Sequence, residues 1–138
     1  MITKKLKGFT IIELIVVIAI IAVLSAIVLV NVTSYIAKSK DASIKGNMTT
    51  VQTNAAAFYD QQSTNTYVGF SASSGYTTPT GAMTGSEGGT ALHEAESVSA
   101  YCVSITLNAG TYWCTDNTGY VGAPTASTTC ASGHIACQ

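Results

Sequence analysis

Residues 8–21 read GFTIIELIVVIAII, and this stretch decides the fold. The apolar run that it opens continues to Val32, so the 24 residues from Phe9 would form a helix of about 36 Å, enough to cross a hydrocarbon core of roughly 30 Å. Seventeen of these 24 residues are Ile, Leu, Val or Phe. Each contributes about −0.3 to −0.6 kcal/mol to the free energy of membrane insertion, which together outweighs the cost of roughly +2.5 to +3.5 kcal/mol for Glu13. The sequence therefore predicts a membrane-spanning helix over residues 9–32 that tolerates one carboxylate.

The lysines before the apolar run predict its orientation. Lys4, Lys5 and Lys7 directly precede the run, so the positive-inside rule holds the amino terminus in the cytoplasm and places residues from 33 onward across the membrane. A cleaved secretory signal has the same charge polarity, but its apolar core is typically about 7–15 residues, shorter than this one. We expect a single-pass protein of the inner, or cytoplasmic, membrane.

The residues around position 8 resemble the amino terminus of type IV pilins and the related pseudopilins. The resemblance consists of a lysine-rich leader, residues 1–8, that ends in Gly8, followed by Phe9, Glu13 and the long apolar helix. It implies that a prepilin peptidase cleaves after Gly8 and that the new amino group of Phe9 becomes N-methylated. It also implies that Glu13 pairs with this amine when a subunit docks beside its neighbour. Many family members carry a proline in the helix, and residues 29–32 contain none.

The resemblance implies a structural function and no enzyme activity. The chain would be a pilin that polymerises with itself through its amino-terminal helix into an extracytoplasmic or cell-surface filament, with an assembly ATPase and a membrane platform protein as further partners. A pseudopilin of a type II secretion or competence system would share every amino-terminal feature. A third interpretation is a single-pass membrane protein whose extracytoplasmic binding head never polymerises.

The helical pattern continues beyond the membrane segment. Ile44, Met48, Val51, Ala55 and Phe58 recur at steps of four, three, four and three, with polar residues between them. This spacing is typical of an amphipathic helix that packs one stripe on a core. We therefore expect residues 33–60 to continue the membrane helix without a break.

Residues 61–96 are predicted to form a connecting loop rich in Ser, Thr and Gly. Between residues 60 and 90, 18 of 31 positions are Ser, Thr or Gly, too polar to fold alone. Tyr67, Val68, Phe70 and Tyr76 are expected to pin this loop to the head. This loop could serve as an exposed surface of the protein or simply as a linker, and the sequence does not choose between the two. Its composition also does not establish whether its hydroxyl groups are glycosylated.

Residues 97–138 are predicted to form a small β head. Val103, Ile105 and Leu107 alternate with polar residues before the turn at residues 108–110, and β-prone residues follow it. With a three-residue loop, Ile105 lies opposite Trp113. The predicted fold is therefore α+β and pilin-like, with a long helix packed on a small antiparallel sheet.

Four cysteines lie in the last 37 residues, and an even number beyond a membrane segment favours two disulfides in an oxidising compartment. Three pairings exist. Proximity in sequence favours Cys102 with Cys114 and Cys130 with Cys137, although the hairpin register makes the first two only diagonal neighbours. The other pairings would tie the carboxyl-terminal tail across the sheet. A zinc site is the competing interpretation, but the spacings match no common zinc motif.

The remaining polar residues predict neither catalysis nor a cofactor or metal. His93 and His134 have no metal-binding or triad spacing around them. Asp116 and Asn117 belong to a polar turn in our interpretation, with calcium ligation as the alternative. No Lys or Arg follows Lys45, so direct nucleic-acid binding by the head is not expected.

Overall fold

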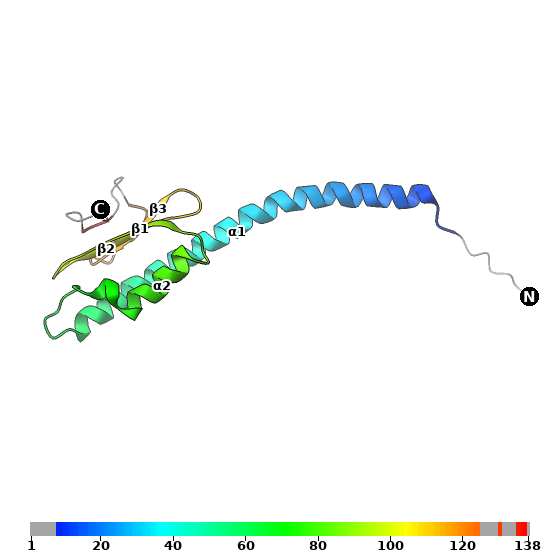
Figure 1. Ribbon diagram of the computed structural model, residues 1–138. Helices are drawn as coiled ribbons and strands as arrows, with labels where there is room; N and C mark the ends of the chain where they lie inside the picture. The colour runs from blue at the N-terminus through cyan, green and yellow to red at the C-terminus, as the bar shows by residue number, and fades with distance from the viewer. Residues whose placement is uncertain (1–7, 125–129, 131–134, 138) are drawn as a thin grey trace, which may run out of the picture. The chain divides into compact units, whose positions relative to one another are not determined.

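The computed structural model describes residues 8–124, 130 and 135–137, and the chain divides into two compact units, Met1–Ile36 and Ala37–Gln138 (Figure 1). The elements are α1 (Ile11–Gln61), the 3-10 helix η1 (Phe70–Ala72), α2 (Ser74–Thr84), β1 (Thr90–Glu96), β2 (Tyr101–Thr106), β3 (Tyr112–Asp116) and β4 (Val121–Gly122). Among the described residues the strands form one antiparallel sheet in the order β1-β2-β3-β4. This confirms the α+β class and the uninterrupted long helix.

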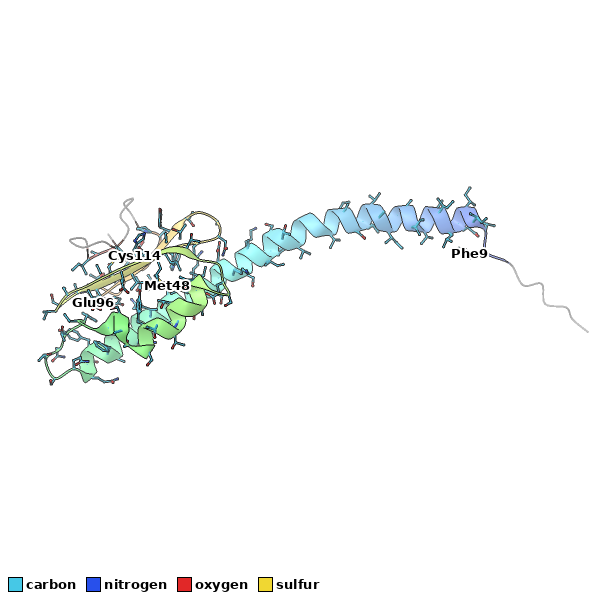
Figure 2. The ribbon with its side chains drawn as sticks, in the orientation of Figure 1. Phe9, Met48, Glu96 and Cys114 are labelled. Carbon is cyan, nitrogen blue, oxygen red and sulfur yellow. A yellow bond between two sulfur atoms is a disulfide. The ribbon has the colours of Figure 1, made fainter. Side chains whose placement is uncertain are left out.

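The predicted apolar stripe of α1 forms the core of the second unit, Ala37–Gln138, which we call the head from here on. Ile44, Met48, Val51 and Ala55 have no exposed surface, and they share one cluster with side chains of β2 such as Ile105. Met48 is labelled on this stripe in Figure 2. Full burial of a large apolar side chain contributes about 1.5–3 kcal/mol, so this stripe is a major source of the head's stability.

The predicted β2–β3 hairpin forms in the expected register. Ile105 pairs with Trp113 and Cys102 pairs with Asp116. The Leu107 amide donates to the carbonyl of Thr111 at 2.8 Å, which closes a three-residue loop at residues 108–110. The alternation therefore places Val103 and Ile105 on the helix side of the sheet and Cys102 on the opposite side.

Trp113 is half-buried and packs against the core. The ammonium nitrogen of Lys45 lies 4.4 Å from the centre of the Trp113 ring. A lysine over an indole face gains a cation–π attraction. The cation of Lys45 therefore has its partner within the head.

Asp41 attaches α1 to the hairpin loop, a contact that the sequence analysis missed. Its side chain is 8% exposed. One carboxylate oxygen accepts from the backbone and side-chain nitrogens of Asn108 at 2.7 and 2.8 Å, and the other accepts from the Ala109 amide at 3.2 Å. A buried carboxylate with three donors holds the loop firmly against the helix.

Replacing Asp41 by Ala should lower the free energy of unfolding by about 2–4 kcal/mol, because three charge-assisted hydrogen bonds to a buried carboxylate are lost. The measurement is denaturant unfolding of the full chain in detergent, followed by the fluorescence of Trp113. Asp60→Ala, at an exposed position of the same helix, is the control and should change stability by less than about 0.5 kcal/mol. Equal effects of the two changes would contradict this role.

Residues 61–96 contain regular structure, which corrects the prediction of a connecting loop. η1, α2 and β1 all lie within this range. The physical reason is that Phe70, Tyr76 and Met83 are buried in the head core. Their burial stabilises a helix that the local Ser, Thr and Gly content disfavours, so tertiary packing overrides propensity.

A side chain of α1 compensates for the proline inside α2. Pro79 has no N–H, so the carbonyl of Gly75 loses its usual helical donor. The side-chain amide of Asn54 donates to this carbonyl at 2.8 Å. The approach is close, because a Cβ at position 75 would lie 3.1 Å from Cβ of Asn54. As a result α2 lies alongside α1 (Figure 1).

The disulfides join Cys102 to Cys130 and Cys114 to Cys137, with Cα separations of 5.7 and 5.8 Å. The favoured pairing of neighbours in sequence is therefore wrong, and the tail is tied across the sheet. Cys102 and Cys114 are diagonal neighbours whose sulfurs lie 3.6 Å apart without a bond. Two tail amides fix this arrangement, since Cys130 donates to Ser104 Oγ at 3.1 Å and Cys137 donates to Asp116 Oδ2 at 2.8 Å.

Peptide mapping should identify these two pairs directly. Digestion of the unreduced chain with chymotrypsin and thermolysin, which cleave around Tyr112 and before Ile135, should separate all four cysteines. Mass spectrometry should then find Cys102 peptides linked to Cys130 peptides, and Cys114 peptides linked to Cys137 peptides. A peptide linking Cys102 to Cys114 would contradict the structure.

Candidate functional site

Thr10 and Glu13 form a reciprocal cap at the start of α1. The backbone amide and the hydroxyl of Thr10 both donate to Glu13 Oε2 at 2.8 Å, and the Glu13 amide donates back to Thr10 Oγ1 at 3.3 Å. These bonds satisfy amides that would otherwise have no partner at a helix start. The signal was present in the sequence, because Thr followed three residues later by Glu is the capping-box pattern, and our sequence analysis did not use it.

The cap leaves one carboxylate oxygen of Glu13 available. Both Thr10 donors go to Oε2, and no hydrogen bond to Oε1 is found within residues 8–124. The carboxylate is therefore oriented by its own helix and still offers an acceptor to an outside donor. A cationic amine is the donor that a carboxylate in a poorly solvated place binds most strongly.

The residues of the expected cleavage site lie just before this cap. Gly8 and Phe9 precede α1, both are exposed, and Phe9 is 76% exposed (Figure 2). Glu13 is in the first turn of α1, four residues after Phe9. The leader lysines Lys4, Lys5 and Lys7 lie outside the described residues.

The apolar part of α1 has no protein cover. Among the described residues, α1 is the one helix long and apolar enough to cross a membrane, and its apolar window is not buried. Ile15 and Ile20 are each 54% exposed. The one hydroxyl in the middle of this segment, on Ser25, donates to the carbonyl of Ile21 at 2.8 Å and so presents no free donor. Such a surface requires lipid or other apolar helices around it.

The acids of the head act as structural acceptors. The two oxygens of Glu96 accept from the amides of Gly69 and Ser71 at 2.8 and 3.0 Å, which fixes η1 to β1. Asp116 accepts from the amide and hydroxyl of Thr118 through one oxygen and from the Cys137 amide through the other. The polar turn at residues 116–119 is thus stabilised by Asp116 itself, and both of its carboxylate oxygens are already used.

Burial raises the pKa values of two tyrosines in the core. Tyr76 has its pKa raised well above the usual value by burial and by its hydrogen bond to Glu94. Burial raises the pKa of Tyr101 to about 12. Both hydroxyls therefore stay protonated at neutral pH. Neither is a candidate base or nucleophile under physiological conditions.

The head offers a shallow cleft and a cluster of sulfurs, but neither forms a convincing reactive site. The cleft, of about 390 Å³, is lined by Tyr67, Tyr101, Gln52 and Asn117 among others, which supply no free charged group. Sulfurs of three cysteines lie within 4.8 Å of one another, yet all four cysteines are in disulfides and hold no thiolate for a metal. His93 is exposed on β1, and His134 lies outside the described residues.

The fold and the site together define a membrane-anchored protein with a disulfide-bonded α+β head and a capped, acid-bearing apolar helix at its amino terminus. Residues 3–29 match the family model of the prokaryotic N-terminal methylation motif. This match supports the resemblance of the amino-terminal segment to type IV pilins and pseudopilins that was noted from the sequence. No curated protein and no solved structure matches the chain.

Replacing Thr10 by Ala should loosen the first turn of α1, because the cap contributes about 1 kcal/mol. Hydrogen exchange of the full chain in detergent should show the amides of residues 10–13 exchanging about fivefold faster. Thr10→Ser keeps the hydroxyl and is the matched control, with exchange close to that of the unchanged chain. Equal rates for the Ala and Ser variants would show that the cap is absent in solution.

Proposed function

We propose that this chain is the structural subunit of a type IV pilus-like filament. Cleavage after Gly8 by a prepilin peptidase, followed by methylation of the new amine on Phe9, gives the mature subunit. The subunit waits in the inner membrane, with its amino terminus on the cytoplasmic side and its head across the membrane. An assembly ATPase and a platform protein then move it into the filament.

The observation that carries this proposal is the open oxygen of Glu13 on an otherwise uncovered apolar helix. Glu13 Oε2 is held by Thr10, and Oε1 has no partner within residues 8–124. Lipid can cover the apolar side chains, but it offers no good partner for a carboxylate within the bilayer. The methylated amine of a neighbouring subunit supplies that partner, while the apolar helices cover one another.

The role of the head follows from its charges and its disulfides. It forms the exterior of the filament, where an oxidising environment maintains the two disulfides. No Lys or Arg follows Lys45, so residues 46–138 supply no Lys or Arg with which to hold a nucleic-acid backbone. Pseudopilins of secretion or competence systems share the amino-terminal motif and are the second candidate.

Glu13→Gln tests the docking role while leaving the cap in place, since a capping box accepts Glu or Gln at this position. We expect normal membrane insertion and normal cleavage, with filament yield reduced at least about tenfold by loss of the charge pair. Electron microscopy of sheared filaments and immunoblots of membrane fractions are the measurements. Mass spectrometry of the mature chain should find a methylated Phe9 as first residue.

Thr10→Ala is the complementary control, because it removes the cap and keeps the charge. It should reduce filament yield much less than Glu13→Gln. Unchanged filaments in the Glu13→Gln variant would remove the docking role of the carboxylate. A mature chain that still begins at Met1, or a cleavage elsewhere than after Gly8, would remove the pilin proposal itself.

A further inference from the structure

Most charged side chains of the head have a partner within the head. Lys45 lies over Trp113, and Asp41, Glu87, Glu96 and Asp116 accept hydrogen bonds from other segments. Two exposed ions on α1 differ from these. Lys38 and Asp60 form no hydrogen bond or ion pair with any residue that the structure describes, and both lie in the second compact unit.

Lys38 and Asp60 lie on the same face of α1. They are 22 positions apart, and at 3.6 residues per turn this separation leaves them about 40° apart around the helix axis. Measured around the axis from the centre of the buried stripe of Ile44, Met48, Val51 and Ala55, Asp60 lies about 150° away and Lys38 about 110° away, so Lys38 lies on the flank of the stripe. At 1.5 Å per residue the two ions are about 33 Å apart along the axis, too far to pair within one helix.

Between these two ions the face carries one further charge, the half-buried Lys45, which lies about 20° from Lys38 around the axis and already contacts the Trp113 ring. All the exposed positions of α1 between them are Ser, Ala, Gly or Thr, namely Ser39, Ala42, Ser43, Gly46, Thr49, Thr50, Thr53, Ala56 and Ala57. Another helix can therefore approach this face closely. The opposite charges of Lys38 and Asp60, at the two ends of this face, would favour one position of the approaching helix along the axis of α1 over others.

We propose that Lys38 of one subunit pairs with Asp60 of a second copy of this chain, and that this pair sets the axial stagger between subunits. The proposal rests on the proposed function, since it requires copies that lie parallel because all are drawn from one membrane in one orientation. Parallel copies in flush register would place Lys38 beside Lys38 and Asp60 beside Asp60, which is repulsive. An axial offset of about 33 Å brings opposite charges together instead.

A charge exchange tests the pair. Lys38→Glu and Asp60→Lys should each reduce filament yield at least about threefold, because each change places like charges together. The double variant should restore the yield to within about twofold of the unchanged chain. Lys40→Glu is the matched control. It makes the same charge change two residues away and about 200° around the helix, so Asp60→Lys should not rescue it. Membrane levels of each variant, measured by immunoblot, show that insertion is intact.

Cross-linking gives a second measurement that needs no variant. A carbodiimide joins a lysine amine to a carboxylate in contact with it, so purified filaments should yield a peptide linking Lys38 to Asp60. This link has to be between subunits, since α1 holds the two residues about 33 Å apart. The same link in detergent-dispersed subunits would indicate an antiparallel pair and would overturn the staggered arrangement.

The outcomes separate this inference from the proposed function. If filaments form and depend on Glu13, but neither single variant lowers the yield and no Lys38–Asp60 link appears, the pair is rejected and the pilin function stands. If single variants lower the yield without rescue in the double variant, each ion meets some other partner and the pair is again rejected. If the unchanged, processed chain makes no filament, both proposals fail.

Discussion

The burial of one stripe of α1 beneath the sheet is the contact on which the rest of the head depends. Ile44, Met48 and Val51 lose all exposed surface there, and β2 supplies the facing side chains. The stripe occupies one side of the helix and α2 contacts another part through Asn54, so the remaining exposed surface of α1 is left for contacts outside the subunit. The amino-terminal part of the same helix has no protein cover at all, so one element both carries the head and anchors the chain.

Much of this architecture could be predicted because it follows from periodicity. The membrane helix was predicted from a continuous apolar run, and the stripe and the β2–β3 register from the repeated spacing of apolar side chains. The pairing of Ile105 with Trp113 occurs as expected. Helix α2 could not be predicted in this way. Its residues favour a loop by composition, and it exists because Tyr76 and Met83 reach a core built by distant segments and because Asn54 replaces the donor lost at Pro79.

The candidate site was predicted in part. Glu13 was singled out as a candidate by its charge and its place after Gly8, whereas its capping role required attention to Thr10. The disulfide pairing was missed because closeness in sequence was given more weight than the diagonal geometry of the hairpin. Most acids of the head tie one segment to another, as Asp41 does for the hairpin loop. No local pattern reveals a contact between residues that are 67 positions apart.

The two disulfides are interleaved along the chain, since each closes a loop that contains one cysteine of the other. In the proposed orientation the head crosses the membrane from its amino-terminal side, and Cys102 and Cys114 are then exposed to oxidation before the tail arrives. If cysteines were oxidised in the order in which they cross the membrane, Cys102 would bond to Cys114, and no disulfide would join the tail to the sheet. The sulfurs of these two cysteines lie 3.6 Å apart in the folded head. Native pairing therefore requires either that oxidation waits for the tail or that a thiol exchanges the first bond. The maturation of this head thus depends on disulfide isomerisation or on delayed oxidation, and not only on the presence of an oxidant.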